Sequence, residues 1–345
     1  MKKLHFLILV LGISLCISCD QELLRPDPIP DPSKFAANQT ILEDFFVKCI
    51  VFGNDGSAWI GTTEGLIHYS QTHSILYNDQ NSMLTDLRIL DIAVDSKDNI
   101  WIGSNGLLKF DGKRFMHFTK ANSDIPVDHV SSLAIDSNDN VWVASSRPGV
   151  GGLAKYSGDK FEVYTPENSP LPAHHTEAIA IDSEDNLWAS AMLGVNFIYI
   201  IRISGETWTI YDSDNFEQKI PWITDLDIDS QNRLCGAIDF GLAPNRFTSP
   251  HVFRFNGDGF DTFTVDSITG WTGKILVDNN DRFWYSFGYG YAYYNGTNWE
   301  KTISEVVEAD PWGYYKTNYN TFQQAPDGNI WIGTSEGIII LEGKE

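Results

Sequence analysis

The sequence predicts an all-β protein, a seven-bladed β-propeller whose blades are four-stranded antiparallel sheets. Three observations lead to this prediction. The 345-residue chain has 28 glycines, 13% aromatic residues and only 20% charged residues, a composition typical of short strands joined by tight turns. A pattern centred on tryptophan recurs seven times along the chain. Successive copies are 41 to 49 residues apart, the length of one propeller blade.

Residues 1–18 have the pattern of a lipoprotein signal peptide. Two lysines precede an apolar stretch at residues 4–15, which is too short to span a bilayer comfortably. Ser18-Cys19 then resembles the cleavage site of a bacterial lipoprotein, so we expect Cys19 to carry the lipid. The alternative is an ordinary secretory signal that is cut nearby.

Residues 19–33 form the predicted tether between the lipid anchor and the folded domain. Four prolines alternate along residues 25–32, a pattern that favours an extended, semi-rigid chain. The two cysteines after the tether, Cys49 and Cys235, lie far apart and outside any Cys-x-x-Cys pattern. We therefore expect buried free thiols and no disulfide framework.

The propeller itself is expected to occupy residues 34–345, about 45 residues for each blade. Three copies of the repeat, at residues 92–103, 133–144 and 179–190, share Asp-Ser-x-Asp-Asn-x-Trp. Each copy predicts one strand before the first Asp, a second around the Trp, a third after a Gly and a fourth that contains aromatic residues. The Asp-rich segment suits a tight turn. The repeat positions are Trp59, Trp101, Trp142, Trp188, Cys235, Trp284 and Trp331.

This pattern resembles the two-component regulator propeller repeat, which builds periplasmic sensor regions of bacterial hybrid two-component systems, especially in gut Bacteroidetes. The resemblance is strongest in Asp-Ser-x-Asp-Asn-x-Trp and in residues 331–337, Trp-Ile-Gly-Thr-Ser-Glu-Gly. It implies the propeller fold and a ligand-sensing ancestry, and the signal pattern of residues 1–19 places this propeller on a bacterial lipoprotein. Such sensors typically carry more repeats, an immunoglobulin-like domain, a membrane span and a kinase, and we expect this protein to act without those signalling domains.

The repeated tryptophan is expected to pack between neighbouring blades and not to bind a ligand. The residue two positions after it is always small, which permits close approach of backbones. The Asp-rich turns could suggest calcium, but their carboxylates more simply accept hydrogen bonds from their own turn amides. No metal and no other cofactor is therefore predicted.

The last repeat has only three strands of its own, so the ring needs a further strand to close. An unpaired third strand would expose a sheet edge, which natural sheets avoid. Residues 34–38 weakly resemble the fourth-strand pattern at residues 160–164. We therefore expect residues near 33–40 to pair with residues 337–341.

A ligand is expected on the face that holds the loops entering each first strand and the loops between second and third strands. The residue 13 positions before each repeat position lies at the mouth of a first strand. These residues are Phe46, Arg88, His129, His175, Trp222, Trp271 and Asn318. Their chemistry suits a ligand-binding rim better than structural turns, although side chains that only cover the channel mouth are the alternative.

Three further loops of this face are rich in aromatic residues, at residues 239–247, 287–291 and 310–319. Aromatic side chains mixed with Asn, Asp and Arg suit stacking on sugar rings, and they equally suit a protein partner. The predicted ligand-binding residues are Arg88, His129, His175, Trp222, Trp271, Trp312 and Tyr314.

Charge and motifs exclude other classes of function. With 24 Lys+Arg against 46 Asp+Glu, the net charge of −22 repels phosphate backbones, so no nucleic-acid partner is expected. The chain contains no Gly-x-Ser-x-Gly and no His-Glu-x-x-His, and it has no phosphate-binding glycine loop. A binding role is therefore favoured over catalysis.

The sequence predicts a lipid-anchored binding module for a glycan or protein ligand. It would lie in the bacterial cell envelope, on the periplasmic or the cell-surface side of the outer membrane, and would contact the membrane through its lipid alone. The alternative is a propeller lyase or hydrolase that acts on a polysaccharide or a small lactone-like substrate, with His129 or His175 as its base.

Overall fold

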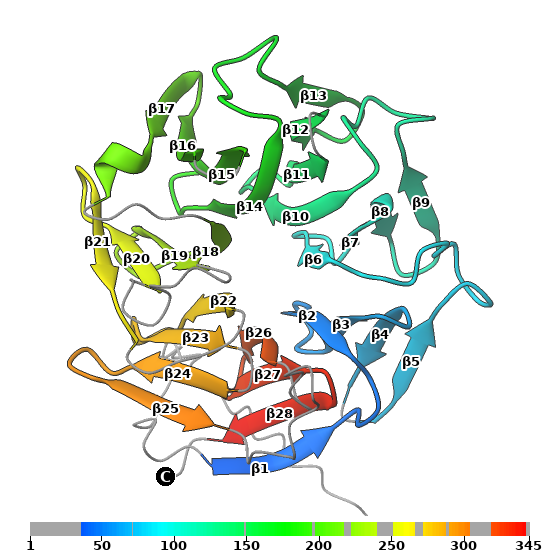
Figure 1. Cartoon of the computed structure of the whole chain (residues 1–345). Helices are drawn as coiled ribbons and strands as arrows, with labels where there is room; N and C mark the ends of the chain where they lie inside the picture. The colour runs from blue at the N-terminus through cyan, green and yellow to red at the C-terminus, as the bar shows by residue number, and fades with distance from the viewer. Residues whose placement is uncertain are drawn as a thin grey trace, which may run out of the picture.

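The computed structural model shows a ring of seven sheets, each with four antiparallel strands, arranged around a central axis (Figure 1). This confirms the predicted fold class. The structure describes residues 36–342 except 71, 148–149, 195–196, 217–221, 240–250, 266–271, 288–289 and 304–318. The signal peptide, Cys19 and the tether lie outside the described residues, so these assignments stay predictions. Among the described residues, no helix is long and apolar enough to cross a membrane.

The blades follow one another around the ring in chain order. Blade one holds β2 (Val47–Phe52), β3 (Ala58–Thr62), β4 (Leu66–Tyr69) and β5 (Ser74–Tyr77). Blade two holds β6 (Asp91–Val94), β7 (Ile100–Ser104), β8 (Gly106–Phe110) and β9 (Phe115–Phe118). Blade three holds β10 (Val130–Ile135), β11 (Val141–Arg147), β12 (Val150–Tyr156) and β13 (Phe161–Tyr164). Blade four holds β14 (His175–Ile181), β15 (Leu187–Leu193), β16 (Phe197–Ser204) and β17 (Thr207–Tyr211).

The second half of the ring repeats this order and ends with a strand from the start of the chain. Blade five holds β18 (Ile223–Ile228), β19 (Leu234–Ile238), β20 (Val252–Phe255) and β21 (Phe260–Phe263), preceded by the short 3-10 turn η2 (Ser213–Asn215). Blade six holds β22 (Thr272–Val277), β23 (Phe283–Phe287), β24 (Gly290–Tyr294) and β25 (Trp299–Ile303). Blade seven holds β26 (Tyr319–Gln324), β27 (Ile330–Thr334), β28 (Gly337–Glu342) and β1 (Ala36–Ile41).

The two ends of the described chain close the ring, as predicted. Strand β1 pairs antiparallel with β28, with Ala37 opposite Leu341 and Ile41 opposite Ile338. Figure 1 shows β1 in blue on the outer side of β28 in red. The edge of β28 is therefore covered, and the last blade depends on residues from the other end of the sequence.

The hydrophobic core consists of clusters between neighbouring blades. Trp101 of blade two is 2% exposed and packs with Val130 and Leu133 of blade three. Trp331 of blade seven packs with Ile50 and Ile60 of blade one, across the point of closure. These contacts confirm that the repeated tryptophan is a packing residue.

The small residue two positions after the tryptophan is required by this packing. A Cβ atom added at Gly61 would clash with the Cys49 and Ile89 side chains, and one at Gly333 would meet Val47 only 2.5 Å away. Cys49 and Cys235 are buried and free, as predicted.

The Asp-rich turns bind their own backbone and also hold neighbouring blades together. Asp182 accepts hydrogen bonds from the amides of Glu184 and Asn186 and from Trp188 Nε1, at 2.9 to 3.1 Å. Asp185 of the same turn has a φ of 61° and accepts from the Ser137 amide and hydroxyl of blade three. The first Asp thus satisfies its own turn, as predicted, and the second Asp links two blades.

Candidate ligand-binding rim

Side chains from the predicted face meet in a hollow between blades two and three. The loop before β6 supplies Arg88, the β7–β8 turn supplies Asn105, the entry to β10 supplies His129, and the end of β11 supplies Arg147. The cavity volume is about 80 Å³, well above the roughly 10–15 Å³ that one water molecule needs. The hollow is lined by Asp86, Arg88, Leu90, Ser104, Asn105, His129 and Arg147.

One arginine of this hollow is held by a carboxylate. Arg88 Nε and one terminal nitrogen donate to the two oxygens of Asp86, at 3.1 and 2.8 Å. Hydrogen bonding to Arg88 keeps the pKa of Asp86 below its usual range, and the same bond raises the pKa of Arg88. Ser104 Oγ donates to the Arg88 carbonyl oxygen at 3.0 Å, which fixes the backbone of this loop.

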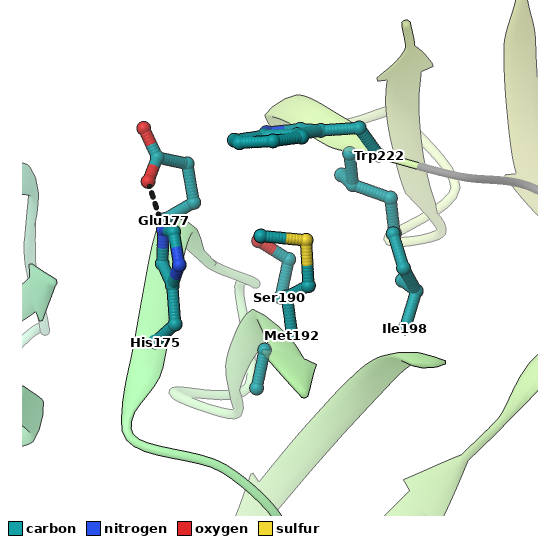
Figure 2. Close-up of a pocket in the computed structure, with 8 residues that line it drawn as sticks. His175, Glu177, Ser190, Met192, Ile198 and Trp222 are labelled. Atoms are coloured by element: carbon teal, nitrogen blue, oxygen red, sulfur yellow. Dashed lines mark hydrogen bonds and ion pairs between the residues drawn. The ribbon is translucent and has the colours of Figure 1, made fainter. Parts of the chain in front are cut away.

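A second pocket lies between blades four and five, where Trp222 and His175 come together. The edge of one ring faces the other, with centroids 5.9 Å apart. Figure 2 shows the Trp222 indole over the Met192 side chain, with Glu177 and His175 on one side and Ile198 on the other. The cavity volume is about 10 Å³, which holds one water at most. Trp222 itself is 39% exposed, so a ligand can reach its indole from outside.

A chain of contacts links the two pockets. The Ser146 amide donates to the His129 carbonyl oxygen at 3.3 Å, and Ser146 Oγ donates to Glu177 Oε2 at 3.3 Å. His175 Nε2 lies 2.9 Å from the same carboxylate oxygen. Burial opposes the charge on Glu177, but its bond to His175 outweighs burial and lowers the pKa of Glu177. Rim residues of blades three, four and five therefore form one connected surface.

Exposed apolar side chains lie at the ends of strands on this same face. Val150 is the first residue of β12, Leu193 is the last residue of β15, and Phe197 is the first residue of β16. These three side chains and that of Trp222 are 39% to 57% exposed. The rim thus offers apolar contact area beside its polar groups.

The first strands carry charged groups that join neighbouring blades. Asp225 on β18 accepts from Lys274 Nζ on β22 at 3.0 Å. Burial works against the charge on Lys274, but Asp225 and Asp91 outweigh it and raise the pKa of Lys274. Asp227 accepts from the Val277 amide at 2.7 Å, and burial raises the pKa of Asp227 to about 7. These groups hold the first strands together.

The described part of the structure covers four of the predicted site residues. Arg88 and His129 line one pocket, and His175 and Trp222 line the other. Trp271, Trp312 and Tyr314 lie outside the described residues, as do Asn318 and most of the 239–247 loop.

One prediction about the loops is wrong. Phe287 and Tyr291 are 1% and 7% exposed and belong to the cores on either side of blade six. Strands β23 and β24 extend to residues 287 and 290, with Phe287 paired to Gly290, so both side chains fall between blades.

Sequence reasoning missed Glu177 and Arg147. Glu177 follows His175 by two residues on β14, and the strand period of two would have placed both side chains on one face. Arg147 is at the end of a β11 strand that runs for seven residues where β7 has five, and no repeat position marks it.

The histidines do not gather into a metal site. His174 Nε2 binds Glu167 at 3.0 Å, and His175 binds Glu177. In the described ranges, no group of three or more His, Cys, Asp or Glu side chains is placed to hold a metal ion.

Comparison with known proteins supports the fold. No curated protein matches the chain in sequence. Streptogramin B lyase superimposes with a TM-score of 0.67 at 15% identity, over 89% of this chain and 96% of that chain. The extracellular domain assigned to a hybrid two-component system of B. thetaiotaomicron gives 0.67 at 16% identity over 92% of this chain. PorZ, a surface component of the type-IX secretion system of Porphyromonas gingivalis, gives 0.58 at 14% identity over 86% of this chain.

The present chain spans only 42% of that two-component domain and 46% of PorZ. At these identities the likeness concerns the fold alone. The profile of the two component regulator propeller family matches residues 83–106 and 316–336, in blades two and seven. The chain is therefore a seven-bladed propeller in which two segments match the repeat of the two component regulator propeller family.

Proposed function

We propose that this protein is a binding module of the bacterial envelope. Its ligand binds on the rim of blades two to five, and the class of ligand that the rim suits best is a glycan. The observation that carries the proposal is the exposed indole of Trp222 beside a hydrogen-bonded chain that leads to the hollow between blades two and three. A flat aromatic ring packs against the apolar face of a sugar, while neighbouring polar groups bind its hydroxyls. A protein ligand would use the same aromatic and arginine side chains.

The envelope location rests on two lines of support. Residues 1–19 have the pattern of a lipoprotein signal that ends in Cys19, and residues 25–32 suit a tether. Proteins of similar fold include an extracellular regulator domain and a bacterial surface component. A lipid on Cys19 would hold the ring close to the membrane surface and leave the rim open to ligand.

The test is a glycan array probed with the purified protein, followed by titration of the best glycan. Replacing Trp222 with Ala should weaken binding by about 1–3 kcal/mol, the cost of truncating an aromatic at the centre of an interface. The melting temperature should stay within a few degrees, because the indole is partly exposed. Ile210→Ala is the matched control, since Ile210 is 41% exposed on the outer strand β17.

Equal loss of affinity in both variants would contradict a rim site. Another outcome is that the array gives no glycan ligand while a pull-down from envelope extract gives a protein partner that depends on Trp222. The ligand would then be a protein, bound at the same site.

A catalytic role is the second candidate, and one observation favours it. His175 and Glu177 form a hydrogen-bonded pair at 2.9 Å on the rim, the arrangement in which a carboxylate orients a histidine base. A lyase of similar fold is known. Turnover of a polysaccharide or of a small lactone that is abolished in His175→Ala and in Glu177→Gln would establish this role. The volume of about 10 Å³ under Trp222 leaves no room for a substrate group, which is why binding is favoured.

A further inference from the structure

The hollow between blades two and three is unusual for its charge. The chain as a whole carries a net charge of −22, yet this hollow is lined by Arg88, Arg147 and His129 and by a single carboxylate, Asp86. Leu90, Ser104 and Asn105 complete the lining and are neutral. The lining therefore has a net charge of +1 even with His129 neutral.

The two arginines are not equivalent. Arg88 already forms a two-point ion pair with Asp86, with its side chain 75% exposed. Arg147 is exposed, and within the described residues its side chain forms no hydrogen bond or ion pair. A guanidinium presents several N–H donors in a planar fork that matches the geometry of carboxylate and phosphate groups. Arg147 is thus the guanidinium that is available to a ligand.

His129 lines the same hollow and has a ring nitrogen that no described residue satisfies. Its Nδ1 atom is buried and has no hydrogen-bond partner in the described part of the chain. A buried nitrogen without a partner costs free energy unless something binds it, and such groups are rare in native proteins. His129 lines the same hollow as Arg147, and the cavity volume of about 80 Å³ leaves room for a small polar group beside it.

We infer that this hollow binds an oxyanion of the ligand, either the carboxylate of an acidic sugar or a phosphate group. Arg147 forms the main charged contact, Arg88 adds a second guanidinium, and His129 forms part of the wall around the bound group. Asp86 competes with the ligand for Arg88 and so limits the affinity. The inference deepens the proposed function, since it assigns an acidic ligand to the same rim, and it rests on that function for the remainder of the ligand.

The experiment uses a matched pair of ligands. Trigalacturonate and its fully methyl-esterified form share one sugar backbone and differ in the carboxylates. Both are titrated into the purified protein by calorimetry, and inorganic phosphate is titrated in parallel. We expect the acid to bind at least about tenfold more tightly than the ester, as for other charge-assisted hydrogen bonds. Added salt should weaken binding of the acid more than binding of the ester.

Two substitutions in the hollow should act in opposite directions. Arg147→Ala should weaken binding of the acid about tenfold or more, because the free guanidinium is lost. Asp86→Asn should strengthen it, because Arg88 is released from its carboxylate. Arg114→Ala is the control: Arg114 is exposed in the β8–β9 turn on the opposite face, and its replacement removes the same charge. It should change affinity by less than about twofold.

The outcomes separate this inference from the proposed function. Equal affinity for acid and ester, both dependent on Trp222, would overturn the oxyanion site and leave the proposed function standing. Equal losses in Arg147→Ala and Arg114→Ala would also overturn it, because only the net charge would then matter. Binding of phosphate without trigalacturonate would support the site and identify phosphate as the natural group. Failure of both anions at millimolar concentration would refute it.

Discussion

The two faces of the ring are built from the same repeats but follow different rules. On the face of the Asp-rich turns, neighbouring blades repeat the same contacts. Ser96 binds Asp139, Ser137 binds Asp185, and Ser230 binds Asp281 through amide and hydroxyl alike. On the rim face, the equivalent position varies among five residue types over the seven blades, namely Phe, Arg, His, Trp and Asn. Repetition thus serves assembly of the ring, and variation is concentrated where a ligand is proposed.

The contrast also appears in how polar groups are satisfied. Asp182 on the turn face is 4% exposed and accepts five hydrogen bonds from its own turn and from Trp188. Nδ1 of His129 on the rim is buried, and no described residue binds it. Because unsatisfied buried groups cost stability, they persist mainly where a ligand or a function requires them. Asp182 is therefore fully satisfied by its own turn and Trp188, whereas Nδ1 of His129 is not satisfied by any described residue.

The largest expected effect comes from opening the ring. A chain that starts at Asp44 lacks β1 and leaves the β28 edge, with Ile338 and Ile340, exposed to water. We expect it to lose most of the roughly 5–15 kcal/mol that stabilises a domain, and to aggregate or unfold at room temperature. Thermal unfolding followed by circular dichroism measures this loss. A chain that starts at residue 34 is the control, and an unchanged melting temperature without β1 would show that closure contributes little.

The fold was predictable from the sequence because each blade repeats the same physical solution. Tryptophan, the small residue after it and the Asp-rich turn recur at blade-length intervals, and even the weak match of residues 34–38 to a fourth strand led to the correct closure. The rim was predictable only in part. Alignment on the repeat finds Arg88 and His175, but Arg147 depends on the length of one hairpin, which no repeat position records. Phe287 and Tyr291 were misplaced for the same reason.

The second-largest effect should show that a change on the turn face alters stability without altering ligand binding on the rim. Asp182→Ala leaves the buried Trp188 Nε1 and two turn amides without their acceptor. We expect a loss of about 2–4 kcal/mol in unfolding free energy, measured by urea denaturation, with ligand affinity of the folded protein unchanged. Glu184→Ala, in the exposed part of the same turn, should lose less than about 0.5 kcal/mol. A larger change in ligand affinity than in stability would mean that the faces are not independent.

The smallest effect concerns Asp227, a carboxylate on β18 that joins two blades and, among the described residues, forms no ion pair. Burial raises the pKa of Asp227 to about 7, above its unfolded value of 3.8. Its protonated form therefore stabilises the fold fully below about pH 4, and this contribution is lost as pH rises toward 7. On the turn face, Asp95 shows the opposite shift: burial opposes its charge, but hydrogen bonds from Asn99 and Trp101 prevail and lower the pKa.

Asp227→Asn removes this titration while retaining a side-chain oxygen that can accept from the Val277 amide. The difference in unfolding free energy between variant and wild type should therefore shift in favour of the variant between pH 4 and pH 7. We expect a shift of about 1–3 kcal/mol, less than the full pKa change implies, because Asp227 is half-buried and water screens it. Urea denaturation at several pH values measures it. A difference that stays constant with pH would mean that Asp227 is ionised throughout. The first strands would then tolerate a buried charge, as the turn face does.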